Sequence, residues 1–253
     1  MRFRNILALV LVVILGFFIL QAFNISPEEG QLVIDEFGEA EIENRTAKLY
    51  INKSVNSSNQ KVVYAESKNL ESGSANMVTS VIANYRSLDT LGEVTVLFLA
   101  ATGLGAVLYS NKKKERNFIV DEGSLILKTG IKILFPLLIL AGAYIFIHGH
   151  LTPGGGFQGG AVIATAFLLK FLADREYELA EHKLKIVEVI AGISFVGLGL
   201  YGLYTDGSFL SNFLETGTIG TLFSAGIIPL IYVSIGLKVG AELTSIISNL
   251  IEA

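Results

Sequence analysis

The sequence contains no cysteine and no tryptophan, and it has little charge and few prolines. Without cysteine, the chain can form no disulfide and offers no thiolate ligand for zinc or an iron–sulfur cluster. Only 17% of its 253 residues are charged, whereas a soluble domain normally has about a quarter. These absences argue against a soluble enzyme and against a redox protein that holds its own cluster.

Most of the chain consists of long apolar runs. Hydrophobic residues make up 51% of the chain, and the mean hydropathy is +0.57. Several runs reach the roughly 20 residues needed to cross a bilayer, so we predict an all-α polytopic membrane protein with about six transmembrane helices. The expected spans are 5–23, 88–109, 127–149, 156–173, 184–204 and one crossing within 219–251. The last run is too long for one straight crossing and contains Pro229, so tilt, a kink or a lead-in segment is expected there.

The segment between the first two spans differs from the rest. Residues 24–75 are polar, are acidic at first, and contain N-glycosylation triplets at Asn44, Asn52 and Asn56. Short apolar patches at 32–34, 49–51 and 62–64 could form small strands or contact a partner. We predict an external segment here, held by a retained anchor rather than a cleaved signal peptide.

Loop charges orient the predicted spans. Lysine and arginine gather in loops on one side of the membrane, whereas the loops 150–156 and 205–218 contain neither residue. The positive-inside rule places both termini in the cytoplasm of a multi-pass protein in the cell membrane. The predicted organisation is an anchor at 1–23, an external segment at 24–75, a helix at 76–110, a cytoplasmic linker at 111–124 and a four-helix domain at 125–253.

Two carboxylates lie near the outer end of the second span. Glu93 is about one to two turns inside it, and carboxylates within a span usually face a protein interior or a water-filled path. Alternatively, Glu93 lies at the interface and pairs with Arg86. Asp89 is shallower, and it is either part of the same path or a helix N-cap.

A loop rich in histidine and glycine follows the third span, from His148 to Gly160. Imidazole can take up or release a proton near neutral pH, so His148 and His150 are candidates for an ion path that includes Glu93. The alternative is that one histidine satisfies loop carbonyls and the other is hydrated. Gly156, Gly160 and Ala164 repeat every four residues, which favours close helix packing over ion coordination by loop carbonyls.

The cytoplasmic half contains four further candidates, which are Lys132, Glu188, Lys238 and Glu242. Lys238 and Glu242 are four residues apart and can face each other on one helix. Lys238 is followed by a largely apolar stretch, which indicates depth in the membrane. Lys132 and Glu188 either serve the inner part of the ion path or, as Lys170 also could, extend to the interface.

Other kinds of site are not indicated. The chain contains no phosphate-binding loop, no nucleophilic triad and no dinucleotide-binding motif. The third histidine, His182, is too distant in sequence from the other two for a convincing metal site. We expect no metal and no cofactor in this chain, with Na⁺ and H⁺ only as transported ions, and no nucleic-acid partner.

Residues 125–253 resemble the B subunit of Mrp-type multisubunit cation/proton antiporters. The resemblance rests on Pro136, on His148-Gly-His150, on Pro153-Gly-Gly-Gly-Phe157-Gln-Gly-Gly160, and on two glycine-rich stretches at 220–226 and 236–240. It implies that the chain works only within an assembly that exchanges Na⁺ for H⁺, and that it has no catalytic activity alone.

Residues 76–110 resemble a second part of the same antiporters, the extreme C-terminal domain of the large A subunit. The similarity is carried by 85–97, from Tyr85 to Leu97, and implies that Glu93 belongs to the ion path. Three positions depart from the expected pattern: Asn84, Leu88 and Leu151 stand where an aspartate, an aromatic residue and an asparagine are expected. In membrane-bound hydrogenases and related archaeal respiratory complexes this domain is a separate small subunit, so the chain resembles a fusion of two subunits.

The resemblance implies a membrane subunit of the Na⁺/H⁺-translocating module of a redox-driven complex, of the membrane-bound hydrogenase or sulfane reductase type. Its expected partners are other Mrp-like membrane subunits, a large proton-pumping-type subunit and, through the complex, iron–sulfur and hydrogenase-like subunits. Two alternatives stay open. The host could be a stand-alone Mrp antiporter, or the chain could be a structural spacer between pump and redox modules.

Overall fold

A computed structural model describes residues 49–50, 52–53, 62–111, 124–174, 177 and 179–252, which all belong to one compact unit. The helices are α3 (Met77–Thr79), the π-helix η3 (Ser80–Tyr85), α4 (Ser87–Asn111), α5 (Leu125–Ile147), α6 (Gly156–Ala173), α7 (Glu181–Asp206) and α8 (Ile228–Glu252). Strands are absent from the described residues, which include 49–50 and the whole patch 62–64. The small strands considered for these two patches are therefore not observed, and the patch 32–34 lies outside the described residues.

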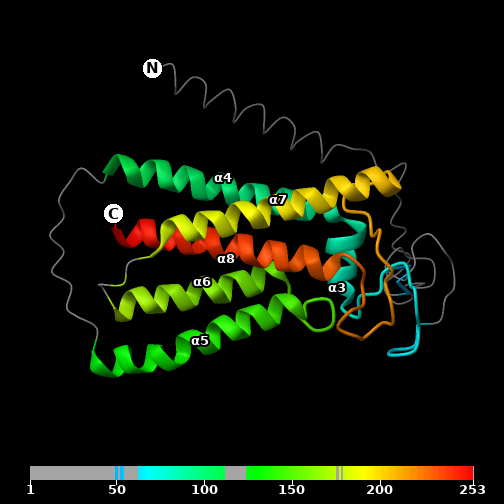
Figure 1. Cartoon of the computed structure of the whole chain (residues 1–253), viewed down its shortest axis with the longest axis horizontal. Coiled ribbons are helices and arrows are strands. Elements are labelled where there is room, and N and C mark those ends of the chain that lie inside the picture. The colour runs from blue at the N-terminus through cyan, green and yellow to red at the C-terminus, as the bar shows by residue number, and fades with distance from the viewer. Residues whose placement is uncertain are drawn as a thin grey trace, which may run out of the picture. The chain divides into compact units, whose positions relative to one another are not determined.

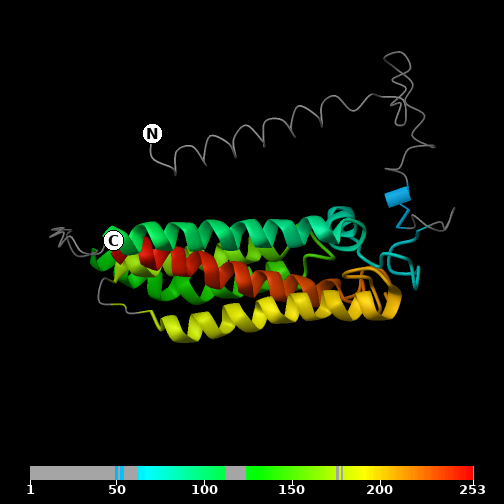
Figure 2. The ribbon, with the colours of Figure 1, turned by 90° about the horizontal axis from the view of Figure 1, so that it is seen from above.

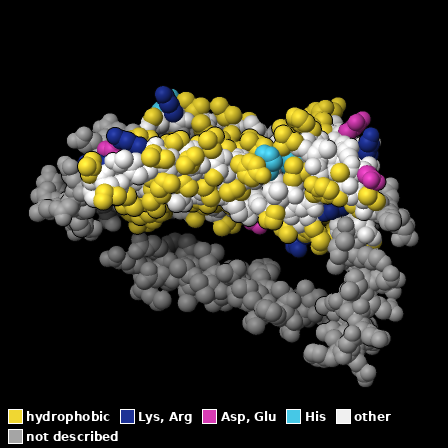
Figure 3. Space-filling model, turned by 90° about the horizontal axis from the view of Figure 1, so that it is seen from below, with side chains coloured by type: hydrophobic (Ala, Val, Ile, Leu, Met, Phe, Trp, Pro, Cys, Tyr) yellow, Lys and Arg dark blue, Asp and Glu magenta, His cyan; other side chains and the backbone are white. Residues whose placement is uncertain are grey.

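Among the described residues, five helices are long and apolar enough to cross a membrane, namely Ser87–Leu108, Leu125–Ile147, Gly156–Ala173, Glu181–Asp206 and Ile228–Ile251. They confirm the predicted all-α polytopic class. The first expected span, 5–23, lies outside the described residues. Figure 3 shows apolar side chains along the length of the bundle and most charged side chains toward its two ends. This distribution is expected of helices that cross a bilayer.

The bundle is organised around α8. This helix lies between α6 and α7, with α5 beyond α6 and α4 on a further side (Figures 1 and 2). In α8, 61% of the membrane-length window is buried, against 6% in α4. Apolar side chains of α8, among them Ile231, Ile235 and Val239, form the centre of the core. The difference makes α8 the central helix and leaves α4 peripheral.

Close backbone contact joins α6 to α8. A Cβ atom added at Gly160 would lie 2.8 Å from both the Gly236 carbonyl oxygen and the Gly240 nitrogen. A Cβ added at Gly156 would lie 2.6 Å from Ile235, and Ala164 on the same face is buried. The small residues of α6 therefore let the two backbones approach, as small residues do between transmembrane helices.

The last apolar run divides into a loop and a helix. Residues 208–227 form turns, and α8 begins only at Ile228, so Pro229 lies in the first helical turn and causes no kink. The Asn212 side chain fixes this lead-in segment: its Nδ2 donates to the Ala225 carbonyl oxygen at 3.2 Å, and its Oδ1 accepts from the Ile227 amide at 2.9 Å.

Candidate functional site

Three charged side chains meet inside the bundle, on α7 and α8. Lys238 Nζ lies 3.3 Å from Glu242 Oε2 and 3.5 Å from Glu188 Oε1. The side chain of Glu242 is 2% exposed, that of Lys238 12% and that of Glu188 22%. We call this arrangement the inner triad. At 1.5 Å per residue, Lys238 lies about 15 Å from the N-terminal end of α8, which is about half the thickness of a hydrocarbon core of about 30 Å.

The local sequence explains how the inner triad forms. Lys238 and Glu242 share a face of α8 because they are four residues apart. On α7, Gly192 leaves room beside the lysine stem: a Cβ there would be 3.8 Å from Lys238 Cδ. The ring of Phe98, on α4, lies 5.1 Å from Lys238 Nζ and makes a cation–π contact. The sequence paired Lys238 with Glu242 by their spacing and indicated Glu188 separately, but it gave no sign of Phe98 or of the pairing between α7 and α8.

Glu93 stands apart from the inner triad. It lies on the exposed face of α4 and makes no hydrogen bond or ion pair with another described residue. The interfacial pairing with Arg86 is not observed, because Arg86 pairs with Asp89 at 2.6 Å. Asp89 is not an N-cap either, since α4 already begins at Ser87. Within a span, an exposed carboxylate without a partner requires cover from another protein surface or from water.

The two histidines have different environments. His148 ends α5, stacks on the Tyr144 ring at a centroid distance of 4.1 Å, and has Nδ1 3.1 Å from the Tyr144 carbonyl oxygen. His150 is fully buried, and neither ring nitrogen has a hydrogen-bond partner among the described residues. Burial lowers the pKa of His150, although the nearby backbone of Thr221 and Leu222 opposes the shift. His150 is therefore held neutral near pH 7.

The segment before α4 holds the loop that carries the histidines. Asn76 Nδ2 donates to the carbonyl oxygens of Gly149 at 3.0 Å and Thr152 at 2.9 Å, and the Ser74 hydroxyl donates to that of His150 at 2.9 Å. The Thr79 hydroxyl donates to the Gly149 carbonyl oxygen at 2.8 Å. The two parts of the chain that resemble different antiporter subunits are thus joined through the main chain of this loop.

Tyr232 of α8 completes the contact. Its hydroxyl donates to Thr79 Oγ1 at 2.9 Å, and its ring occupies the space beside Gly149, where a Cβ would lie 2.6 Å away. Neither histidine contacts Glu93 within the described part of the chain, so the expected outer group of Glu93 with a histidine does not form directly there.

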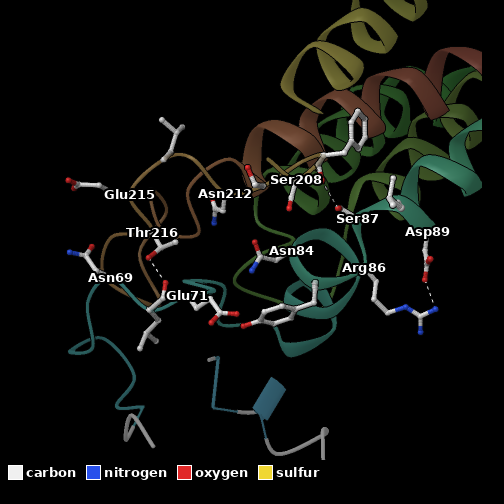
Figure 4. Close-up of a pocket in the computed structure, with 16 residues that line it drawn as sticks. Asn69, Glu71, Asn84, Arg86, Ser87, Asp89, Ser208, Asn212, Glu215 and Thr216 are labelled. Atoms are coloured by element: carbon white, nitrogen blue, oxygen red, sulfur yellow. Dashed lines mark hydrogen bonds and ion pairs between the residues drawn. The ribbon is translucent and has the colours of Figure 1, made fainter. Parts of the chain in front are cut away.

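A polar pocket of about 960 Å³ opens beside the start of α4 (Figure 4). Its walls come from residues 69–71, 84–89 and 208–216. Glu71, Glu215 and Asp89 contribute carboxylates, and Arg86 contributes the guanidinium that pairs with Asp89. Burial and the adjacent Glu71 raise the pKa of Tyr85 in the same wall. The pocket therefore offers an acidic surface that reaches Asp89, about one helical turn before Glu93 on α4.

Two lysines complete the survey. Lys132 is exposed on α5 and belongs to neither the inner triad nor the polar pocket. Lys53, which the sequence did not single out, is buried and donates from Nζ to Ser80 Oγ at 2.8 Å. Burial lowers the pKa of Lys53 to about 8. No group of three or more metal-ligating side chains occurs among the described residues.

The fold and these charges define a class: a polytopic membrane subunit with ionisable groups buried between its helices. Residues 126–245 match the model of a domain related to the MnhB subunit of Na⁺/H⁺ antiporters. The chain belongs to this family of antiporter-type membrane subunits.

Three similar proteins extend the family match. One chain of an archaeal membrane-bound sulfane sulfur reductase, a respiratory membrane complex, is 43% identical, with a TM-score of 0.69 over 98% of this chain and 97% of that one. An uncharacterized protein of Methanocaldococcus jannaschii is 36% identical over 67% of this chain and 74% of its own length. A chain of the Mrp complex from Dietzia sp. shares the fold at 22% identity, with a TM-score of 0.61 over 99% of this chain and 26% of that one.

Proposed function

We propose that this chain is a membrane subunit of the Na⁺/H⁺-translocating, Mrp-like module of a redox-driven respiratory complex of the sulfane reductase type. The observation that carries ion translocation is the inner triad, because ionisable groups at membrane depth mark ion and proton pathways. The choice of host rests on the near-complete alignment with a chain of the sulfane reductase.

The proposed path has an outer and an inner part. The outer part begins at the polar pocket and continues to Glu93, one helical turn further into the membrane than Asp89. The inner part is the triad of Glu188, Lys238 and Glu242, which touches α4 through Phe98. His148 and His150, in the loop after α5, make no hydrogen bond to Glu93 among the described residues, and the proposed route does not include Lys132. Na⁺ and H⁺ are the proposed transported ions.

The open face of α4 supports a place inside a larger assembly. Glu93 is exposed there, and so are Val96, Leu99 and Val107. The proposed partners are other Mrp-like membrane subunits and a large proton-pumping-type subunit, with iron–sulfur and hydrogenase-like subunits connected through the complex. The proposed orientation has both termini in the cytoplasm, which places the polar pocket on the outer side.

Glu93→Ala tests the proposal. It should abolish Na⁺-linked ion transport by membrane vesicles that contain the whole complex, while the complex still assembles on a native gel. Glu181→Gln is a suitable control, since Glu181 is half exposed at the start of α7 and its ion pair with Lys185 is 4.0 Å long. Normal transport by the Glu93 variant would refute the proposed path.

The host complex is tested separately. Mild-detergent extraction of native membranes, a native gel and mass spectrometry of the co-migrating subunits should reveal iron–sulfur and hydrogenase-like subunits. A band that holds only antiporter-type subunits would assign the chain to a stand-alone Mrp antiporter instead. If neutral replacements of Glu93, His148 and Lys238 all leave transport unchanged in assembled complexes, the chain is a structural spacer.

A further inference from the structure

The inner triad has one positive charge too few. Glu188 and Glu242 supply two carboxylates, and Lys238 supplies the ammonium that lies between them. When all three groups are ionised, the net charge is −1. No other charged side chain forms an ion pair with these groups within the described residues, and Phe98, which contacts the ammonium, carries no charge.

An uncompensated negative charge at this depth is costly, because neither lipid nor packed side chains solvate it as water does. The cost falls mainly on Glu242, which is the most buried of the three residues. Both of its carboxylate oxygens are buried, and the one charged partner on α8 is Lys238, 3.3 Å from Oε2. Because Lys238 can neutralise only one of the two carboxylates of the triad, the other requires a proton or a bound cation.

We propose that the inner triad binds one exchangeable monovalent cation, H⁺ or Na⁺, and that Lys238 competes with this cation for the two carboxylates. When Lys238 pairs with Glu188, Glu242 holds the cation. When Lys238 pairs with Glu242, the cation moves to Glu188, which is more exposed. No covalent bond other than the carboxyl O–H forms or breaks, so charge and protons balance. The proposal rests on the proposed function and assigns its inner binding site.

The contacts suit such an exchange. Lys238 Nζ is nearly equidistant from the two carboxylates, at 3.3 and 3.5 Å, so a small movement of its flexible side chain changes its partner. The glycine at 192 leaves ordinary van der Waals space next to the lysine stem. Phe98 lies against the ammonium from α4, the helix that also carries Glu93, so the position of Lys238 is linked to the outer part of the path.

Dicyclohexylcarbodiimide labelling tests the site, because this reagent modifies protonated carboxyl groups in apolar surroundings. The whole complex is treated in native membranes in Na⁺-free buffer, and the peptides containing Glu188 and Glu242 are analysed by mass spectrometry. The expected result is an adduct at one of these residues. Suppression of the adduct by added Na⁺ identifies a site where Na⁺ and H⁺ compete, whereas an adduct insensitive to Na⁺ identifies a site for H⁺ alone.

Two variants make the test decisive. Lys238→Met leaves two carboxylates without a cation, so both should carry protons and label more strongly than in the wild type. If this variant is labelled and the wild type is not, the proposal is overturned. If neither protein is labelled, the rate of Na⁺-linked transport by a second variant tests the proposal. Glu242→Gln leaves Lys238 and Glu188 as a neutral pair, and this variant should lose Na⁺-linked transport. Transport at the wild-type rate then overturns the proposal.

The outcome is separable from that of the proposed function. Glu93→Ala should abolish transport but leave carbodiimide labelling of the inner triad unchanged, because Glu93 contacts none of its members. If Glu93→Ala stops transport while the labelling and Glu242→Gln tests fail, only the cation site is wrong. If labelling succeeds and Glu93→Ala transports normally, the site exists and the proposed path is wrong. Glu181→Gln, on the same helix as Glu188 but exposed, is the control for both measurements.

Discussion

The side chains of the inner triad and of Glu93 are all ionisable and lie within spans, but only those of the triad have charged partners among the described residues. The triad lies between α7 and α8, and its ammonium is paired with two carboxylates of the same chain. Glu93 lies on α4, the least buried of the five spanning helices, and has no partner among the described residues. One group is assembled by folding of this chain, whereas the other requires a surface that the described residues do not provide.

This contrast predicts that mutations in the two regions affect stability and transport differently. Removing one partner of a buried ion pair leaves the other charge without compensation, so a change in the triad should lower the stability of the fold as well as affect transport. A group that faces out of the bundle contributes little to its stability, but it is placed where a partner or water can exchange an ion with it. The following predictions compare the two regions directly.

The largest expected difference in stability is between Lys238→Ala and Glu93→Ala. Removing Lys238 leaves the buried Glu242 and the partly exposed Glu188 without a counter-charge, which should cost about 3–5 kcal/mol, whereas Glu93→Ala should change stability by less than about 0.5 kcal/mol. The measurement is the temperature at which half of this subunit aggregates from the solubilised complex. Equal shifts in the two variants would show that the distinction between the regions is wrong.

A double variant sharpens the same comparison. Lys238→Met combined with Glu242→Leu removes both members of the most buried pair and should recover about 1–3 kcal/mol relative to Lys238→Met alone, because no unpaired charge then remains on α8. The same aggregation measurement applies. A double variant less stable than the single one would mean that Glu242 has a partner other than Lys238.

Two glycines near the inner triad should respond differently to alanine. Gly160→Ala places a Cβ 2.8 Å from backbone atoms of α8, so α6 and α8 must separate, at a cost of about 1–3 kcal/mol. Gly192→Ala meets only Lys238 Cδ at 3.8 Å and should change stability by less than about 0.5 kcal/mol. Thermal stability of the two variants checks the prediction. Equal losses would indicate that α6 and α8 are not packed as closely as described.

The smallest effect expected is a pH dependence at the outer loop. Burial lowers the pKa of His150 in the folded chain below the value of about 6.5 that it has when unfolded. Just below that pH the unfolded state binds more protons, so the loop should lose stability as the pH falls and regain it as the pH rises. Hydrogen exchange of residues 148–155 should therefore increase on acidification, after correction for the intrinsic rate. His150→Gln should remove this dependence, and an unchanged dependence would assign it to another group.

The sequence predicted the helices well because membrane-length hydropathy is a property of the chain itself. The span 156–173 coincides with α6, and the spans around it are correct within a few residues. The lead-in loop before α8 could not be separated from the helix, since its residues are as apolar as those that follow. Lys238 and Glu242 were paired by their spacing, but the contact with Glu188 depends on how α7 is rotated against α8, which the sequence does not specify.

The histidines illustrate the same limit. His148 and His150 are two residues apart in one polar loop, and nothing in their immediate sequence distinguishes them. In the structure one stacks on Tyr144 at the end of a helix, while the other is buried behind groups from 74–79 and 221–222. Contacts between distant segments determine which imidazole is buried. The sequence therefore indicated both histidines as candidates but could not show which of them is buried.

The joint between residues 74–79 and the loop at 149–152 tolerates change unequally on its two sides. Ser74, Asn76 and Thr79 donate to carbonyl oxygens of the loop, and every residue type has a carbonyl. Substitutions in the loop therefore keep these acceptors, except at Gly149, where a side chain would meet the ring of Tyr232. The three donors have no such freedom, because their side chains make the hydrogen bonds. Variation at this joint should therefore fall on loop positions other than Gly149 and spare the donors.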